Sequence, residues 1–239
     1  MRLIRQRQIN PELLERLPVN DPRAIHSRHD LRRINAIMMH ARIISRTLVR
    51  YCKAPPRNII DLGSGDGTLM LKIARRFSPG WRNVCVVLLD HQNIVSTETR
   101  DWFSHLQWHV EPLGADVFDF LRLSPPMSSD AIIANLFLHH FEDWQLKRLL
   151  NYAARQASLF VACEPRRGRM PLLLSAMTRA IGANGVTRHD AVASVCTGFR
   201  GRELSSLWPK SDRWWLREWA ATPLSHCFVA VRTSASDGL

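Results

Sequence analysis

The chain has 239 residues, of which 46% are hydrophobic and 23% are charged, and these values exclude intrinsic disorder as the default interpretation. Lysine and arginine outnumber aspartate and glutamate by 33 to 21, which gives a formal net charge of +12. This excess favours a polyanionic partner such as RNA, but the arginines are spread along the chain and are not interleaved with aromatic residues, so nucleic acid binding is a minor alternative.

Residues 11–53 are predicted to be helical. Asp30 is in position to cap a helix whose apolar residues recur every three or four positions over 31–49. Pro55-Pro56 ends this helix, because proline lacks a backbone donor and cannot continue the hydrogen-bond pattern. We therefore expect residues 1–55 to form an amino-terminal helical lid.

From residue 56 onward the pattern changes to alternating strands and helices. The predicted strands are 58–62, 84–89, 106–110, 130–135, 158–163, 214–219 and 226–231, and the predicted helices are 68–77, 94–104, 144–154 and 169–181. Continuous apolar strands separated by helices indicate a mostly parallel sheet that is covered on both faces. The last two strands have no helix between them, so they should form an antiparallel pair. Residues 56–239 would form this domain, with 164–212 as a cap insertion between strands 5 and 6.

A glycine-rich turn joins the first of these strands to the following helix. The sequence Asp61-Leu-Gly63-Ser-Gly65-Asp-Gly67 follows a strand and opens a helix, which is the context that a nucleotide-binding loop requires. Glycine permits positive φ and close backbone approach, and the helix amino terminus offers unpaired N–H groups. A pyrophosphate ligand is disfavoured, because the acids in this turn would repel it and the Gly-Lys-Ser/Thr of a phosphate loop is absent.

Acids also follow the next two predicted strands. Asp90 ends the second strand, at the distance from the glycines where a carboxylate accepts hydrogen bonds from ribose hydroxyls. Asp116 follows the third strand and could accept from the exocyclic amine of adenine. Acids in these positions suit a cationic ligand without phosphate.

The glycines alternate as GxGxG with an acid two residues ahead. This pattern resembles the first motif of class I S-adenosylmethionine-dependent methyltransferases, and Asp90 resembles their second, over about residues 57–163. The resemblance implies an α/β, Rossmann-like, seven-stranded sheet with a reversed final strand, and a transferase of class EC 2.1.1. It also implies S-adenosyl-L-methionine as the cofactor, whose sulfonium and ammonium groups suit these acids. The loop would then hold the methionine part, Asp90 the ribose and Asp116 the adenine, while Asn135 would lie near the sulfonium. The predicted cofactor-binding residues are Asp61, Gly63, Ser64, Gly65, Gly67, Asp90, His91, Asp116, Val117 and Asn135.

Two adjacent histidines follow the fourth predicted strand. Ligands of doubly wound sheets bind beyond the carboxyl ends of strands, so His139 or His140 could face the reacting atoms. The run Leu-His-His-Phe-Glu-Asp resembles the same segment of small-molecule methyltransferases of the ubiquinone/menaquinone-biosynthesis type. A neutral imidazole can take a proton from a phenol or enol, and we predict His140 first and His139 second as the base. The alternative is that these histidines only pack under the cofactor or cap the next helix.

The cap insertion is predicted to cover the substrate. Its first helix is rich in leucine and methionine, and Arg188 and His189 are candidates for binding an acidic or phenolic substrate. The structural alternative is a surface turn with Asp190 as a helix cap. The region resembles methyltransferases that tailor polyketides and related secondary metabolites.

These patterns predict methylation of a small hydroxylated molecule that is phenolic, enolic or quinol-like, with O-methylation ahead of C-methylation. One alternative is an RNA methyltransferase, which the charge favours and which the lack of a Pro-Pro-Tyr/Phe motif after Asn135 opposes. Another is a binding module that retains the cofactor loop without catalysis.

The spacing of the cysteines and the amino-terminal sequence indicate whether the protein binds a metal and whether it is exported or inserted into a membrane. None of the five cysteines forms a CxxC pair, so we predict free thiols and no metal site. The basic amino terminus is not followed by an apolar signal segment, and no apolar run approaches the ~20 residues that span a bilayer. We expect a cytoplasmic protein without a membrane span, and a homodimer is left open.

Overall fold

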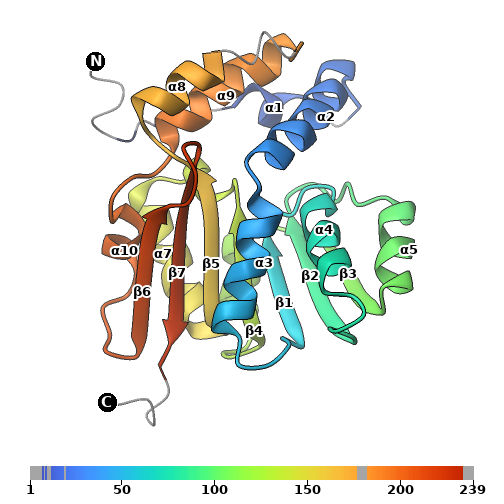
Figure 1. The fold of residues 1–239 in the computed structure, drawn as a ribbon, viewed down its shortest axis with the longest axis vertical. Helices are drawn as coiled ribbons and strands as arrows, with labels where there is room; N and C mark the ends of the chain where they lie inside the picture. Colours follow the sequence, from blue (N-terminus) through green and yellow to red (C-terminus); the bar gives the residue numbers. More distant parts are fainter. Residues whose placement is uncertain (1–6, 8, 10–11, 19, 177–181, 234–239) are drawn as a thin grey trace.

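A single seven-stranded sheet, in the order β3-β2-β1-β4-β5-β7-β6, forms the centre of the fold (Figure 1). The structure is a computed structural model that describes residues 7, 9, 12–18, 20–176 and 182–233. Neighbouring strands from β3 to β5 pair in parallel, and β7 is antiparallel to both β5 and β6. This topology confirms the predicted sheet with a reversed final strand. The strands are β1 (Asn58–Leu62), β2 (Val84–Asp90), β3 (Trp108–Gly114), β4 (Ser129–Asn135), β5 (Ala157–Pro165), β6 (Trp214–Ala220) and β7 (Ser225–Arg232).

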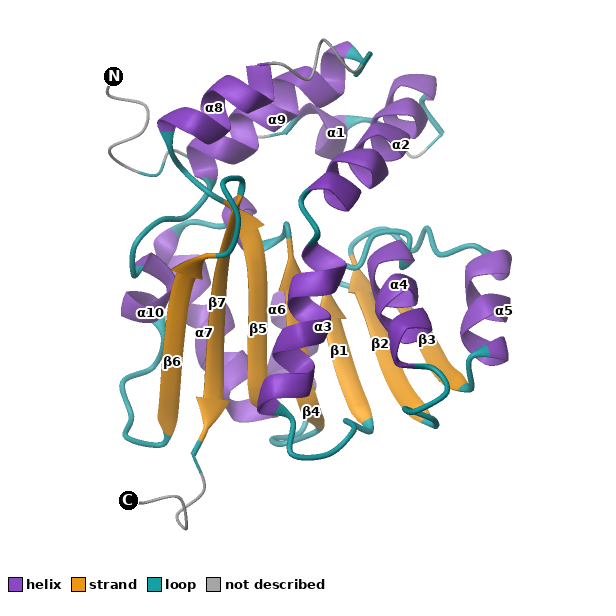
Figure 2. Cartoon of the chain, in the orientation of Figure 1, coloured by secondary structure: helices purple, strands orange, loops and turns teal. Residues whose placement is uncertain are grey.

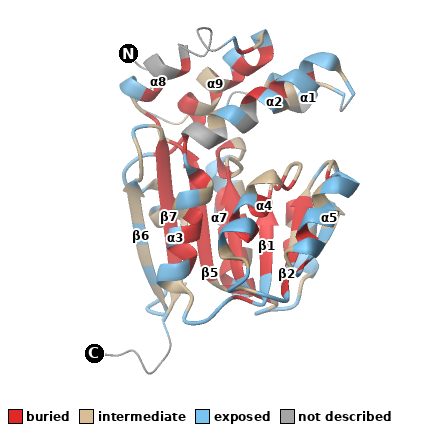
Figure 3. Ribbon diagram, turned by 45° about the vertical axis from the view of Figure 1, so that its right-hand side comes forward, coloured by how far each residue is buried: buried red, intermediate tan, exposed pale blue. Residues whose placement is uncertain are grey.

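Helices cover both faces of the sheet (Figure 2). They are α1 (Leu13–Arg16), α2 (Pro22–Ile37), α3 (His40–Tyr51), α4 (Thr68–Phe77), α5 (Thr97–His105), α6 (Val117–Leu123), α7 (Asp143–Gln156), α8 (Arg169–Ala176), α9 (Gly185–Thr197) and α10 (Glu203–Leu207), with a short 3₁₀ turn η2 (Leu138–His140). Successive strand residues point to opposite faces, so Ile59 packs under α3 and α4 whereas Ile60 packs under α6 and α7. Figure 3 shows that the central strands are buried almost along their whole length.

Two elements differ from the sequence prediction near the edge of the sheet. The third strand was expected at 106–110, but α5 ends at His105, Gln107 adopts a positive φ of 59°, and β3 runs from Trp108 to Gly114. β3 includes Pro112, which an edge strand tolerates because its outer side needs no donor. Helix α6 was not predicted. It begins because Asp116 accepts hydrogen bonds from the N–H groups of Phe118 and Asp119.

The amino-terminal helices begin and end at other residues than expected. The prediction that Asp30 caps a helix is wrong, because α2 begins at Pro22, which suits the first helical turn, and continues through Asp30. The break comes instead at Met39, whose φ is 56°. Asp30 is buried and accepts hydrogen bonds from Asn184 N at 3.0 Å and from Thr187 Oγ1 at 3.1 Å. A buried carboxylate in the middle of α2 thus connects this helix to α9.

Four helices, α1, α2, α8 and α9, form a lid beyond the carboxyl ends of the parallel strands (Figure 1). Asp190 was considered as a helix cap within its own segment, but it lies inside α9, whose cap is Asn184. The Asp190 carboxylate instead accepts from Leu13 N at 2.8 Å and Leu14 N at 3.0 Å, and so caps α1. α3 does not belong to this lid, because its buried residues Ile44 and Leu48 join the core against the sheet.

The predicted helix 169–181 is present as α8 up to Ala176, and residues 177–181 lie outside the described part of the chain. Helix α9 was not predicted. Across the described ranges, no helix is long and apolar enough to cross a membrane.

Candidate active site

The glycine turn after β1 is fixed to the end of β2. The N–H groups of Gly63 and Ser64 donate to Leu89 O at 2.8 and 3.1 Å. Gly63 has a φ of +69°, and a Cβ at this position would lie 2.3 Å from Cδ2 of Phe137. Phe137 follows β4, so the residue at 63 must be glycine for the segments after β1 and β4 to approach each other.

Gly65 lies at the open part of the same turn. Its φ is +56°, and a Cβ here would meet nothing within 4 Å. Its N–H donates to Asp90 Oδ2 at 2.9 Å, and Asp90 Oδ1 accepts from Gln92 N at 2.9 Å. Asp90 is thus oriented by two backbone donors at the end of β2. A carboxylate has about four acceptor sites, so this geometry leaves capacity for two ribose hydroxyls.

Asp61 is a buried acid without a partner. It is 1% exposed, and neither carboxylate oxygen has a hydrogen-bond partner among the described residues. Burial raises the pKa of Asp61 to about 8, and the nearby charge of Asp90 adds to this effect. Ser64 Oγ and Asn135 Oδ1 are likewise buried and unpartnered in this region. An ammonium group would supply donors and positive charge here, so these residues fit the amino acid end of an adenosyl sulfonium cofactor.

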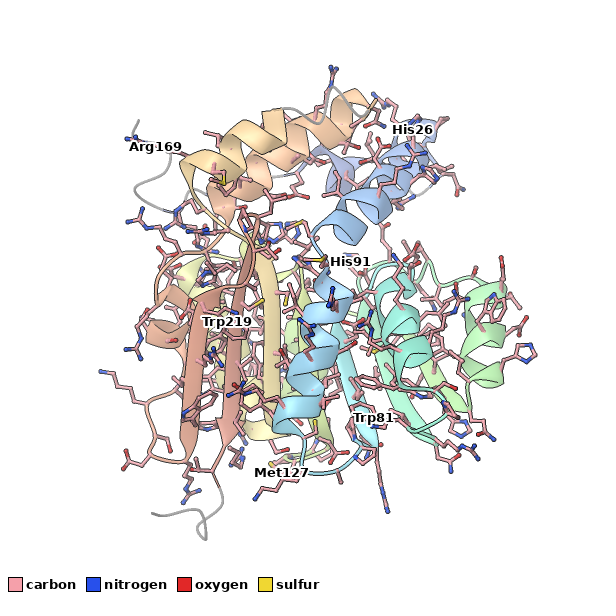
Figure 4. All side chains as sticks on the ribbon, in the orientation of Figure 1. His26, Trp81, His91, Met127, Arg169 and Trp219 are labelled. Carbon is pink, nitrogen blue, oxygen red and sulfur yellow. The ribbon has the colours of Figure 1, made fainter. Side chains whose placement is uncertain are left out.

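The remaining predicted cofactor residues lie along the same edge of the sheet. Asp90 and Gly114 pair in register, so Asp116 and Val117 lie just beyond the neighbouring strand end. Asp116 Oδ1 is engaged in capping α6. His91 is exposed, and Figure 4 labels it near the carboxyl ends of the strands, on the side of the sheet facing the lid.

Glu164 organises the turn that contains the two histidines, and sequence reasoning missed this role. Its side chain is fully buried at the end of β5. Oε1 accepts from Phe137 N at 3.1 Å and Leu138 N at 2.9 Å, and Oε2 lies 2.8 Å from Nδ1 of His139. The available signal was an acid directly after the apolar run of a predicted strand.

The two histidines differ in charge. His139 is 3% exposed, and its Nε2 lies 3.3 Å from Glu12 Oε1. Burial alone would lower the pKa of His139, but hydrogen bonds to Glu12 and Glu164 outweigh burial and raise the pKa to about 9. The ring of His140 lies 4.1 Å away, and burial together with the charge of His139 lowers the pKa of His140 to about 4. At neutral pH the pair is therefore one imidazolium and one neutral imidazole.

Comparison with known proteins identifies the domain that holds this site. A family described as "Methyltransferase domain" matches residues 59–157, from β1 to the start of β5. The chain carries a class I S-adenosylmethionine-dependent methyltransferase domain. No curated protein sequence matches the chain.

Solved structures share the fold of this methyltransferase. The plantazolicin methyltransferase BpumL in complex with SAH has a TM-score of 0.61 at 12% identity, over 90% of this chain and 92% of that one. An O-methyltransferase family protein from Burkholderia thailandensis has a TM-score of 0.61 at 15% identity, over 98% and 67%. A protein from Nostoc punctiforme PCC 73102, described as an O-methyltransferase, has a TM-score of 0.59 at 12% identity, over 96% and 66%. At sequence identities this low, the similarity shows only that the folds are alike.

The lid of the methyltransferase contacts the histidine turn through residues near the amino terminus. Glu12 accepts from Ser194 Oγ on α9 as well as contacting His139. Burial alone would raise the pKa of Glu12, but its hydrogen bond with His139 lowers the pKa to about 2. Ligand atoms of Glu12, His139 and His140 lie within 4.8 Å of one another, a spacing that a metal ion could bridge. An imidazolium between two carboxylates accounts for the contacts of His139 without one.

The predicted substrate residues are on the lid. Arg188 and His189 are both exposed on α9, and His189 Nδ1 lies 3.0 Å from Asp190 Oδ1. Among the residues described, no hydrogen bond joins either side chain to a predicted cofactor or catalytic residue. A role for these two residues in substrate binding stays a prediction.

Proposed function

We propose that this methyltransferase transfers a methyl group from S-adenosylmethionine to an oxygen atom of a small phenol, enol or quinol. The observation that carries the proposal is the pair His139 and His140, held by Glu164 under the lid just beyond β4. O-methylation is also the activity by which two proteins with the same fold are named.

The cofactor residues have separate tasks in this proposal. Asp61 binds the ammonium group, Asp90 the ribose hydroxyls, and Asp116 with Val117 the adenine, while Asn135 lies beside the reacting sulfur. The bound cofactor supplies an electrophilic methyl group. The ammonium group supplies the donors that the buried carboxyl group of Asp61 lacks, and its positive charge favours loss of the Asp61 proton when the cofactor binds.

The histidines act on the acceptor. His140 is neutral at pH 7 and takes the proton of the acceptor hydroxyl as the new oxygen–carbon bond forms and the carbon–sulfur bond breaks. His139 keeps its proton, and its fixed positive charge stabilises the negative charge that develops on the acceptor oxygen. Glu164 holds the ring of His139 in place from both the turn backbone and Nδ1.

The lid supplies positioning and excludes water. Contacts from Glu12 and Arg7 bring the amino-terminal segment to the histidine turn, with Arg7 donating to Phe141 O and pairing with Asp143 at 3.2 Å. Methyl transfer is an in-line displacement, which benefits from a short, aligned approach in a dry site. A lid held over the histidine turn in this way favours a small acceptor over a polymer.

Label transfer tests this function. Purified protein is incubated with tritiated cofactor and a panel of small phenols and quinols, and in parallel with RNA. We expect label in the organic extract and an O-methyl product by mass spectrometry. Exchange of His140 for asparagine should lower kcat by roughly 10²- to 10⁴-fold, the usual contribution of a general base, with unchanged affinity for S-adenosylhomocysteine.

The matched control is the same exchange at His105, an exposed residue on α5. Its kcat should equal that of the unmodified protein. Label in RNA alone would replace the proposal with the nucleic acid alternative. A His140 variant with full kcat would remove the base assignment.

A further inference from the structure

His40, the first residue of α3, has a ring nitrogen that the fold leaves without a partner. Its side chain is fully buried, and Nδ1 has no hydrogen-bond partner among the described residues. Nε2, in contrast, lies 2.8 Å from Oγ of Ser225, the first residue of β7. A buried polar atom without a partner lowers the stability of the fold, so Nδ1 marks a position where a ligand could bind.

Ser225 determines which nitrogen of His40 carries the proton. The hydroxyl group of Ser225 has one hydrogen, which it donates to Met38 O at 3.4 Å. Oγ therefore accepts from His40, so the ring proton is on Nε2. Burial lowers the pKa of His40 to about 4, so the ring is neutral at pH 7. Nδ1 then has a free lone pair and acts as a hydrogen-bond acceptor.

Two other acceptors without partners lie on the same side of the sheet. Asp61 pairs in register with Ile133, and Asn135 is two residues further along β4, so both polar side chains point to the face that α3 covers. Asn135 lies beside His40, and its side chain is the main influence that opposes the lowering of the pKa of His40 by burial. Asn135 Oδ1 and His40 Nδ1 are both acceptors, so neither can satisfy the other.

The backbone turn that places His40 at this position is unfavourable. Met39 has a φ of 56° and a ψ of 25°, which is the left-handed region that residues with a side chain rarely adopt. The turn separates α2 of the lid from α3 on the sheet and brings His40 to Asn135, the last residue of β4 (Figure 1). Backbone strain of this kind is concentrated at functional sites.

We infer that His40 is a further cofactor-binding residue, whose Nδ1 accepts a hydrogen bond from the ammonium group of S-adenosylmethionine. An ammonium group has three N–H donors. Within the described part of the chain, Asp61, Asn135 and His40 each offer a buried acceptor that lacks a partner. The contact rests on the position of the ammonium group beside Asp61 that the proposed function gives, and it does not depend on which atom is methylated.

A matched pair of variants separates the two nitrogens of His40. In His40→Gln, the amide reaches the position of Nε2 and can still bind Ser225, but no polar atom remains at the position of Nδ1. In His40→Asn, the amide oxygen lies near the position of Nδ1, and the contact with Ser225 is lost. Calorimetry measures the affinity of each variant for S-adenosylhomocysteine, which has the ammonium group, and for methylthioadenosine, which lacks the whole amino acid part.

We expect His40→Gln to weaken binding of S-adenosylhomocysteine by roughly tenfold to 100-fold, the usual contribution of one hydrogen bond to a charged group. Its affinity for methylthioadenosine should not change, which also shows that the variant is folded. His40→Asn should lose less affinity for S-adenosylhomocysteine than His40→Gln. The control His109→Gln makes the same exchange at an exposed residue of β3 and should bind both ligands as before.

Three results would overturn the assignment. They are unchanged affinity of His40→Gln for S-adenosylhomocysteine, an equal loss for both ligands, and a greater loss in His40→Asn than in His40→Gln. An equal loss would mean that His40 only supports the shape of the site. All of these are binding measurements without turnover, so they are independent of the label-transfer test of O-methylation.

A second measurement needs no variant. Proton–nitrogen correlation spectra of the histidine rings report which nitrogen carries the proton. We expect the Nε2–H form of His40 in the free protein, and a shift of the Nδ1 resonance on addition of S-adenosylhomocysteine that methylthioadenosine does not cause. A proton on Nδ1, or the same shift with both ligands, would show that Nδ1 does not accept from the ammonium group.

Discussion

Asp61, near the end of β1, and Gly63, two residues later in the following turn, are constrained in opposite ways. Gly63 is required by the fold, because Phe137 occupies the space of a side chain. Asp61 is unfavourable for the fold, because its carboxylate is buried without a partner among the described residues. A buried polar group that lowers the stability of the fold and lies next to a ligand-binding turn indicates a role in binding.

Exchange of Asp61 for asparagine tests that role. Asparagine cannot carry the negative charge that attracts the ammonium group of the cofactor. A hydrogen bond to a charged group contributes about 1.5–3 kcal/mol. We expect affinity for S-adenosylhomocysteine, measured by calorimetry, to fall roughly tenfold to 100-fold. Asp101→Asn, on the surface of α5, should leave the affinity unchanged. Equal affinities in the two variants would contradict the assignment.

Gly63 and Gly65, two of the three glycines of the turn, form a matched pair for a test of stability. Alanine at Gly65 meets nothing within 4 Å, so it costs only the positive φ, about 1–2 kcal/mol. Alanine at Gly63 adds the clash with Phe137, for a further cost of about 1–3 kcal/mol. We expect urea unfolding to give a clearly lower midpoint for Gly63→Ala than for Gly65→Ala. The reverse order would mean that Phe137 does not cover the turn.

At the scale of elements, the lid is assembled from two segments that are far apart in sequence. The bond from Leu13 N to Asp190 spans 177 residues, and the bond from Asn184 N to Asp30 spans 154. Both acceptors are carboxylates buried between helices. The lid therefore depends on a few charged hydrogen bonds in addition to its apolar contacts.

Asp190→Asn should loosen one element of the lid. The variant weakens the cap of α1, and loss of a helix cap costs about 0.5–2 kcal/mol. We expect faster hydrogen exchange over residues 12–18, by roughly threefold to 30-fold, with unchanged exchange in β1 and β4. The exposed Asp212→Asn is the control. Uniformly faster exchange over the whole domain would show that Asp190 acts on global stability and not on α1.

At the scale of the whole molecule, buried titratable groups set the dependence of stability on pH. The pKa of Asp61 is raised to about 8, so between about pH 4 and pH 8 the folded state holds a proton that the unfolded state has lost, and stability falls as pH rises. The pKa of His139 is raised to about 9, so its stabilising contribution is complete below about pH 6.5 and is lost through pH 9. Both effects act in the same direction.

Below about pH 6.5 these effects are opposed by the buried His140, whose lowered pKa of about 4 makes stability rise with pH. The protein without cofactor should thus be most stable near pH 6.5. We expect its thermal midpoint to decrease from about pH 6.5 to pH 9, and the decrease to be smaller in Asp61→Asn, which has no carboxyl to ionise. Scanning calorimetry over this range measures both. A midpoint that is flat in the unmodified protein, or an identical slope in the variant, would contradict the buried, unpartnered state of Asp61.

The sequence alone determined the sheet, its reversed final strand and the glycine turn with Asp61 and Asp90. These features depend on local signals, namely apolar periodicity and turn residues, which persist whatever the rest of the chain does. It also predicted the histidine pair, but it could not assign a charge to either ring.

Only the tertiary structure decided the charges of the two histidines and the way in which the lid is held, because the contacts responsible join residues that are far apart in sequence. Glu164 meets His139 only because β4 and β5 are neighbours, and Glu12 meets it only because the lid brings residues 127 apart together. Asp30 and Asp190 looked like local helix caps, yet each bonds to another helix. Burial and carboxylate contacts give the two adjacent histidines opposite charge states, and both depend on the path of the whole chain.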